Sequence, residues 1–507
     1  MTAVDVPLQG EQPAPPDRRR IATNFVTLAV TGALGLVVTL LISIYVRRML
    51  GPTAMGQVSW SLAVIGYLGM IVNPGLTPIG ERELARNRLR GNELLALVLT
   101  LQTAFSAIVY ALLVVFAAFD LRGPAVSILL LIQGLTLFLT AWNSGWVLQA
   151  YERMVIPSVA SLVINALQLP VLLLFVHSPD DTNLYAFLAL PFALAGVIFN
   201  FWYMIRRGAV RSLRLRPTFA GSARLLREAW PVALAQAAIL ILQTSGIIIL
   251  GFTSGDNAVG QYATAHRLIM VASLGTAALW NAFFPALARS STVPDHAAEL
   301  SREFLGLLAW IGFPLAALGW ACGRHVVELM YGAAFAESGL YFEWLSLSIA
   351  LTYLYYGLVA ILMPLGRSTL QFQIIAVAAA VNLALNAIAI PLYGPWGSIA
   401  AMLAAETVLL GLGLAMRNRG GLLNHAILPV VAPPLLCSLG VAVVIVLLPP
   451  SWHHFWWFEL TSGAVVLLIC LIGFERDALR RMVSGLDRTL ENIPALQSPK
   501  MSKCLKN

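Results

Sequence analysis

The sequence has 507 residues, of which 59% are hydrophobic and 11% are charged. Soluble proteins carry about 25% charged residues, whereas apolar runs of about 18 residues or more, long enough to cross a membrane, recur along this whole chain. The composition therefore excludes a soluble globular protein and indicates a polytopic membrane protein. The formal net charge of +8 does not indicate nucleic-acid binding, because the basic residues gather in loops and tails between the apolar runs.

The residues that several common chemistries need are missing from the body of the chain. All three lysines lie within the last eight residues, which removes any P-loop lysine or Schiff-base lysine from the apolar part. The four cysteines form no C-x-x-C pair and lie in or beside apolar runs or in the C-terminal tail. We therefore expect no disulfide framework, no metal site and no cofactor.

The predicted elements are all helices, about 14 in number, and most fall into two groups of six. A polar, Pro-rich tail, 1–21, precedes an N-terminal six-helix bundle, 22–205, whose spans are predicted at 22–46, 57–79, 93–119, 124–148, 156–177 and 183–205. A basic linker, 206–228, leads to a C-terminal six-helix bundle, 229–416, with spans at 229–252, 262–288, 304–323, 341–365, 369–391 and 396–416. The segment 324–340 is too polar to span and is expected at the membrane interface. Two extra transmembrane helices, 13 and 14, are predicted within 427–474, at 427–448 and 458–474, before a C-terminal tail, 475–507.

The distribution of basic residues predicts the orientation of these spans. When both termini, the tails and the linker are placed in the cytoplasm, all but five of the 32 lysines and arginines fall on the cytoplasmic side. The five exceptions are Arg47, Arg48, Arg122, Arg267 and Arg324. The sequence thus predicts a multi-pass protein of the cytoplasmic membrane with an even number of spans.

A short sequence repeat relates the two groups of six. The heptapeptide GPTAMGQ at 51–57 recurs as GDNAVGQ at 255–261, each time at an outward-facing turn after the first span of its group. A second match relates NALQLP at 165–170 to NAIAIP at 386–391. Because both matches lie six spans apart, the two bundles are predicted to have the same orientation and to be related by a pseudo-twofold axis along the membrane normal. Positive φ and close helix approach are expected at the turn glycines, Gly51, Gly56, Gly255 and Gly260.

Three motifs resemble those of a known transporter family. Residues 48–52 read RMLGP and are followed by Gly56, 329–332 read LMYG before Phe335, and 393–394 read YG before Gly397. They are similar, in order and position, to turns of the Wzx-like polysaccharide-export flippases of the multidrug/oligosaccharidyl-lipid/polysaccharide (MOP) superfamily. The resemblance implies a two-bundle fold and export of a lipid-linked oligosaccharide or polysaccharide precursor. Arg47 departs from the family pattern, in which small residues precede the motif arginine.

Arginines are the candidate ligands for such a substrate. A polyprenyl-(pyro)phosphate linker is anionic, and the guanidinium fork suits phosphate. Arg47, Arg48 and Arg267 are candidates because they oppose the positive-inside trend beside the repeated turns, although snorkelling to the interface is the alternative. Arg82 and Arg86, at the inner end of the second span, are candidates for capture from the cytoplasmic leaflet, although the positive-inside trend alone also explains them.

Other polar residues within the spans offer further chemistry. Glu406 lies near the middle of the twelfth span, which makes it a candidate for H⁺ or Na⁺ coupling or else a buried acid paired with a neighbouring helix. The amides of Asn165 and Asn386 are candidates for binding sugar hydroxyls, with interhelical hydrogen bonding as the alternative. Trp142 and Trp146 are candidates for stacking on sugar rings, with interfacial anchoring as the alternative. In the first span Asn24, Thr27, Thr31 and Gly35 form a polar stripe expected to face a cavity or a packed neighbour.

Three functional classes follow from these observations. We predict a monomeric flippase that moves a lipid-linked sugar by alternating access among membrane lipids, and not an enzyme or a nucleic-acid-binding protein. An ion-coupled drug or cation antiporter of the same superfamily is the alternative transporter. An integral-membrane glycosyltransferase or polymerase is less well supported, because Asp180 and Asp181 lie in a short loop that offers them no partner.

Overall fold

The computed structural model describes residues 18–88, 91–120, 122–207, 219–290, 294–420 and 427–446. Every long element within these ranges is a helix, and 11 helical segments are long and apolar enough to cross a membrane. They carry the first twelve predicted spans, because one long helix contains the first two. The predicted all-helical, polytopic fold is confirmed. The predicted span 458–474 and most of the two tails lie outside the described residues.

The first half of the chain follows the predicted order with two differences. Its helices are α1 (Arg18–Val72), α2 (Leu76–Arg86), α3 (Gly91–Ala118), α4 (Pro124–Gly134), α5 (Thr136–Ala141), α6 (Gly145–Ala150), α7 (Val155–Phe175) and α8 (Thr182–Arg206), with the short 3-10 helix η2 (Pro179–Asp181) before α8. The predicted span 57–79 is wrong at its end, because α1 stops at Val72 and Gly75, with φ of 77°, turns the chain into α2. The predicted span 124–148 is divided among α4, α5 and α6.

The second half contains longer helices. They are α9 (Phe219–Thr253), α10 (Gly255–Ser290), α11 (Pro294–Tyr331), α12 (Ala336–Val359), α13 (Ser368–Tyr393), α14 (Pro395–Gly420) and α15 (Leu428–Val446), with short 3-10 helices η3 (Ala333–Phe335) and η4 (Ala360–Leu362) on either side of α12. The segment 324–340, expected at the membrane interface, is helical over most of its length, because α11 continues to Tyr331 and α12 begins only five residues later. Arg324 there donates to Glu343 of α12 at 2.9 Å, so that the polar side chains pair between the helices.

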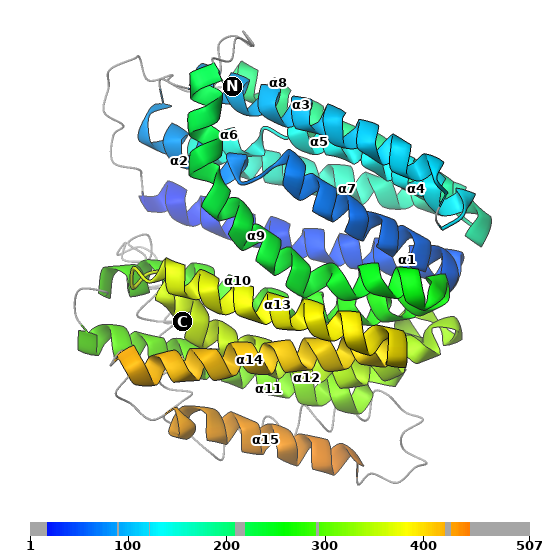
Figure 1. Cartoon of the computed structure of the whole chain (residues 1–507). Helices are drawn as coiled ribbons and strands as arrows, with labels where there is room; N and C mark the ends of the chain where they lie inside the picture. The colour runs from blue at the N-terminus through cyan, green and yellow to red at the C-terminus, as the bar shows by residue number, and fades with distance from the viewer. Residues whose placement is uncertain are drawn as a thin grey trace, which may run out of the picture.

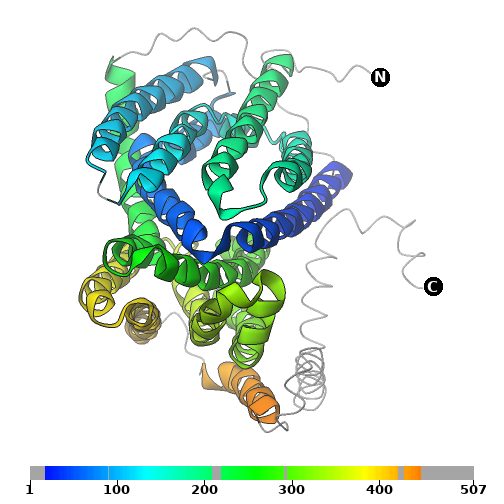
Figure 2. The same ribbon diagram turned by 90° about the vertical axis from the view of Figure 1, so that its right-hand side faces the viewer.

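The helices of both halves run roughly side by side and form two layers (Figure 1). The first half, blue to cyan, lies on one side, and α10 to α14 lie on the other, with α15 packed on α11 at the outer edge. Seen along the helices, the two arms of α1 meet at an angle beside α10 (Figure 2). Most of the apolar core is one cluster that includes α1, α10 and α12 and so joins the two halves.

One helix belongs to both halves. The first part of α9 contributes Leu225 and Ala229 to a separate core cluster formed by α2, α3 and α6. Its second part packs along α13 and reaches the boundary with α1. In Figure 1 this helix crosses obliquely from one layer to the other. We call the end of the molecule that contains Gly51 and Gly255 the Gly51 end, and the end that contains Arg82 and Glu228 the Arg82 end.

Candidate functional site: the contact between the halves

The first glycine of each repeated heptapeptide breaks a helix. Gly51 interrupts α1 with φ of 73° and ψ of 175°, and Pro52 restarts the helix at the position that proline favours. Gly255, with φ of 80°, separates α9 from α10 in the same way. A side chain is strained at positive φ, so glycine is needed at both positions for the turn itself.

The second glycine of each heptapeptide has a different role. Gly56 and Gly260 lie inside α1 and α10, so the expectation of a turn with positive φ is wrong for them, whereas the expected close helix approach is confirmed. A Cβ atom on Gly56 would lie 1.8 Å from the carbonyl oxygen of Asp256, and a Cβ atom on Gly260 would lie 1.8 Å from that of Pro52. The two copies of the heptapeptide therefore pack directly against each other through a reciprocal contact.

A polar cluster surrounds this contact. Arg122, in the loop between α3 and α4, forms an ion pair with Asp256 at the start of α10. The guanidinium of Arg122 also lies over the ring of Trp60, 4.3 Å from its centroid. The Gln57 amide donates to the second oxygen of Asp256 at 2.9 Å, and the Trp60 indole donates to the carbonyl of Ile248 at 3.1 Å. Burial lowers the pKa of Arg122, and the carboxylate of Asp256 opposes that shift.

Two further arginines join the halves at the same end. Arg47 is only 8% exposed, donates to the hydroxyl of Thr264 in α10 at 3.1 Å and lies over the ring of Tyr331. Arg48 is exposed and donates to the carbonyls of Leu329 and Met330, where the negative end of the α11 dipole favours a cation. The three arginines of the first half that were expected on the outer face, Arg47, Arg48 and Arg122, thus all contact the second half.

The structure does not bring Arg48, Arg267 and Glu406 into one site. Arg267 is exposed and lies close enough to Arg47 and Tyr185 for their charges to interact. Arg48 is held by α11, and Glu406 is buried within the second half. Arg47 and Arg267, rather than Arg48 and Arg267, are therefore the neighbouring pair of cations.

Glu406 lies in a polar cluster among the helices of the second half. One carboxylate oxygen accepts a hydrogen bond from Thr352 of α12 at 2.8 Å, and the other has no partner within the described residues. Nearby, Asn386 donates to Ser245 of α9 at 3.0 Å and to Asn382 at 2.9 Å. The bond to Ser245 is an interhelical hydrogen bond, which was the alternative to sugar binding, and the bond to Asn382 lies within α13.

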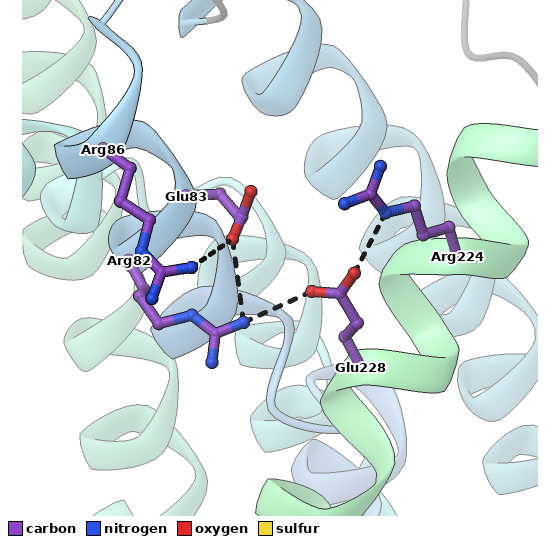
Figure 3. Close-up of polar contacts among 5 residues, drawn as sticks. All are labelled: Arg82, Glu83, Arg86, Arg224 and Glu228. Atoms are coloured by element: carbon purple, nitrogen blue, oxygen red, sulfur yellow. Dashed lines mark hydrogen bonds and ion pairs between the residues drawn. The ribbon is translucent and has the colours of Figure 1, made fainter.

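At the Arg82 end an exposed network of ion pairs joins α2 to α9 (Figure 3). Arg82 contacts Glu228 at 3.3 Å and Glu83 at 3.7 Å, and Arg86 contacts Glu83 at 3.5 Å. Arg224 contacts Glu228 from the preceding turn of α9 at 3.0 Å. Exposed pairs of this kind contribute about 0–1 kcal/mol each, so the network orients the two helices more than it stabilises them.

The tryptophans and Asn165 have contrasting surroundings. Trp146 is 3% exposed and packs on Gly80 of α2, which leaves no free face for a sugar. Trp142 is 37% exposed and lies beside Phe201 of α8. Asn165 lines a cavity of about 340 Å³ between α1, α6, α7 and α8, together with Thr31 and Gly35 of the predicted polar stripe.

Three residues of the polar cluster at the Gly51 end, Arg122, Asp256 and Trp60, were not among the candidates predicted from the sequence. Arg122 was visible as an exception to the positive-inside trend, and its isolation in an outward loop was the available signal. Asp256 replaces Pro52 of the first repeat copy, and this difference marks the carboxylate that Arg122 binds. Trp60 carried no signal, because a tryptophan near a helix end is ordinary in membrane proteins.

Comparison with known proteins first defines the class. The fold resembles that of "Lipid II flippase MurJ, inward closed conformation" with a TM-score of 0.71 and 14% identity, over 90% of this chain and 100% of that one. It also resembles an inward-facing multidrug resistance MATE family transporter of the MOP superfamily, with a TM-score of 0.60 and 16% identity, over 78% and 98% of the two chains.

The family follows from the sequence match. Residues 21–291, more than half of the chain, match the model of the family described as "Polysaccharide biosynthesis protein", and the chain belongs to that family. A "Putative O-antigen transporter" of Shigella dysenteriae is 24% identical over 376 residues, which cover 72% of this chain and 92% of the relative. One of Escherichia coli (strain K12) is 21% identical over 264 residues, 48% and 59% of the two chains. These findings confirm the resemblance drawn from the turn motifs.

Proposed function

We propose that the protein is a flippase that moves a polyprenyl-(pyro)phosphate-linked oligosaccharide across the cytoplasmic membrane by alternating access. The observation that carries the proposal is the set of contacts at the Gly51 end, where four residues of the first half, Arg47, Arg48, Gln57 and Arg122, bind the second half. Family membership and the relatives named as putative O-antigen transporters give the same class of substrate. The activity is transport, not catalysis.

The proposed orientation places both termini in the cytoplasm and the Gly51 end outside. The positive-inside distribution supports it, because the Arg82 end carries a cluster of arginines, including Arg82, Arg86 and Arg224. The reciprocal contact supports the proposed pseudo-twofold relation. Gly260 lies against the carbonyl of Pro52 in the same way as Gly56 lies against the carbonyl of Asp256. In this arrangement the described conformation is closed to the outside.

Arg47 and Arg267 are the proposed ligands of the anionic linker. Arg47 is buried among hydroxyls and an aromatic ring, and the contacts described for it include no carboxylate. A buried cation without an anionic partner is costly, so an anion that arrives at this position gains a partner that the protein has not already neutralised. Arg48, by contrast, is proposed to hold α11 against α1.

Glu406 is the proposed coupling site for H⁺ or Na⁺. It is 4% exposed, and one of its oxygens has no partner within the described residues. Intramembrane carboxylates are rare and mark ion or proton pathways. The same feature would also serve the second candidate function, drug or cation antiport, which the likeness of fold to the MATE transporter favours.

A translocation assay separates these two functions. The full chain is reconstituted in proteoliposomes with a fluorescent undecaprenyl-pyrophosphate-linked disaccharide, and protection of the label from a membrane-impermeant quencher is measured. We expect protein-dependent translocation, and Arg267→Gln should reduce it by about tenfold, because a charge-assisted contact to phosphate contributes about 1.5–3 kcal/mol. Arg324→Gln, which removes a cation already paired with Glu343, should have little effect. Ethidium efflux without lipid translocation would contradict the proposal and support antiport.

The role of Glu406 has its own test in the same vesicles. Glu406→Gln preserves the acceptor for Thr352 but removes the charge, so we expect the variant to fold and to lose the stimulation of transport by an imposed H⁺ or Na⁺ gradient. Glu337→Gln, at the start of α12, is the matched control. Gradient stimulation that survives in Glu406→Gln would show that Glu406 is only a structural acid.

A further inference from the structure

The cavity at Asn165 lies among the membrane-spanning helices of the first half and has a largely polar lining. It lies between α1, α6, α7 and α8 and has a volume of about 340 Å³, at the lower end of the range of about 300–1,000 Å³ typical of small-molecule sites. Its polar lining consists of Thr31, Gln149, Ser158, Ser161, Asn165 and Asn200. It extends from Met154, next to the Arg82 end, to Asn165, the middle residue of α7.

Thr31 donates to the carbonyls of Thr27 and Leu28 in its own helix, whereas the other polar side chains of this cavity have no hydrogen-bond partner within the described residues. Gln149, Ser158, Ser161, Asn165 and Asn200 form no side-chain hydrogen bond within the described residues. An amide can make up to about four hydrogen bonds, and leaving one unsatisfied at membrane depth is costly. These groups therefore need either water or a hydrogen-bonding ligand.

The two faces of α7 differ in polarity, although both carry exposed residues. Ser158, Ser161, Leu162 and Asn165 follow helical spacing along the face that lines the cavity. The exposed apolar residues of the helix lie at other positions: Ile156, Val159, Val163, Leu167 and Leu174. α7 thus presents an apolar surface to lipid and a separate hydroxyl and amide surface to the cavity.

Two glycines of α1 leave the cavity open. Gly32 and Gly35 line it, and a Cβ atom on either would meet nothing within 4 Å. Glycine inside a helix costs about 0.5–1 kcal/mol relative to alanine, and helix packing does not require it here. The space that these glycines leave is the cavity itself.

The spanning segment that forms another wall is discontinuous. α5 ends at Ala141 and α6 begins at Gly145, and residues Gly145, Leu148 and Gln149 line the cavity. Broken helices are typical of binding sites in transporters, because their free backbone groups can face a cavity.

We propose that this cavity binds an uncharged sugar unit of the substrate, separately from the anionic linker. The inference rests on the proposed function. The lining offers donors and acceptors but no charged side chain, which suits a polyhydroxylated group and not a pyrophosphate, whose burial needs cations. In the proposed orientation the cavity is nearest the cytoplasmic side, where such a substrate is loaded.

Photocrosslinking in proteoliposomes tests the proposal. One probe is an undecaprenyl-pyrophosphate-linked disaccharide with a diazirine on its terminal sugar, and the other carries the diazirine on the prenyl chain. We expect the sugar probe to label peptides within 145–165 and the prenyl probe not to label them. Sugar labelling confined to other segments, or prenyl labelling of 145–165, would overturn the inference.

Matched variants separate occupation of the cavity from folding. Gly35→Leu should fill the cavity and reduce labelling of 145–165 by at least about fivefold, whereas Gly411→Leu, at another open helical position, should not. Asn165→Leu should reduce it by about three- to tenfold, as expected for one or two lost hydrogen bonds, with Gln168→Leu on the same helix as the control. Unchanged labelling in both cavity variants would contradict the proposal.

Translocation measured in the same vesicles distinguishes a failure of the proposed sugar site from a failure of the proposed flippase function. If the disaccharide lipid is moved but 145–165 is not labelled, the sugar site is wrong and the flippase function stands. If the lipid is neither moved nor crosslinked at any position, the proposed function fails and the sugar site fails with it.

Discussion

At the scale of single residues, glycine performs three different tasks in this chain. Gly51 and Gly255 supply positive φ at helix breaks. Gly56 and Gly260 allow two helices to touch at their backbones, and Gly32 and Gly35 leave a cavity open. The residue type alone does not distinguish these tasks, since each depends on what lies opposite.

Gly56→Ala should therefore destabilise the contact between the halves. The added methyl group would overlap the carbonyl of Asp256, so α1 and α10 must separate. Overpacking of this kind costs about 1–3 kcal/mol, and the midpoint of thermal unfolding in detergent should fall. Gly411→Ala meets nothing within 4 Å and should raise the midpoint slightly. Equal effects of the two variants would show that the reciprocal contact is unimportant.

At the scale of elements, α9 determines how the halves are connected. Its first part packs with α2 and its second with α13, so any rearrangement of one half against the other must bend α9 or release one of its contacts. Pro231 lies within the helix, shortly after the contact with α2. Proline removes a backbone hydrogen bond and favours a bend at that point.

Gly75→Ala tests the junction between α2 and α9. A Cβ atom there would lie 2.9 Å from the carbonyl oxygen of Ala229 and from the Cβ of Val232, and the φ of 77° is strained for alanine. Gly123→Ala suffers the same kind of strain, at φ of 91°, but meets no neighbour. We expect faster amide exchange in α2 and the start of α9 for Gly75→Ala only. The prediction is wrong if both variants exchange alike.

At the scale of the whole molecule, three arginines from the first half bind the second half at the Gly51 end. Arg47, Arg48 and Arg122 contact α10 and α11 through a hydroxyl, two carbonyls and a carboxylate. Hydrogen bonds and ion pairs can be exchanged for water one at a time, so such a contact can open and close. The apolar side chains below this contact interdigitate tightly, and they have no hydrogen bonds that water could replace.

Removing the ion pair should shift the molecule towards the open state. Arg122→Gln leaves Asp256 partly buried without its cation, a loss of about 1.5–3 kcal/mol and thus more than tenfold in population. Ser61→Cys, fully buried next to Trp60, should then react faster with a membrane-impermeant maleimide in a background without the native cysteines.

Two further variants make this test specific. Arg324→Gln breaks a pair within the second half and should not change the rate. Replacing both partners, with Arg122→Met and Asp256→Leu, should cost less than the sum of the single changes, because no charge is left unpaired. Additive effects would indicate that the two residues do not act as a pair.

Some residues of the candidate site could be predicted from the sequence, and others could not. Periodicity and charge placed Glu406 inside the membrane, and the structure describes it as buried. The pairing of Arg47 with Thr264 joins residues that are far apart in the chain, and no local pattern marks such a contact. For Gly56 and Gly260 the expected close helix approach is confirmed, but the expected positive φ is wrong, because a heptapeptide with two glycines suits a turn as well as a helix contact.

The sequence by itself determined the membrane class and the order of the first twelve spans, because each apolar run must satisfy its backbone hydrogen bonds as a helix wherever it lies in the bilayer. It also determined the family, through turn motifs that are local in the chain. Only the tertiary structure decided that the repeat copies touch, that Arg48 binds α11, that Asn165 lines a cavity and that Asn386 bonds to Ser245 of α9. Those outcomes depend on which helix face meets which neighbour, and the uniform apolar pattern of membrane helices leaves that choice to packing.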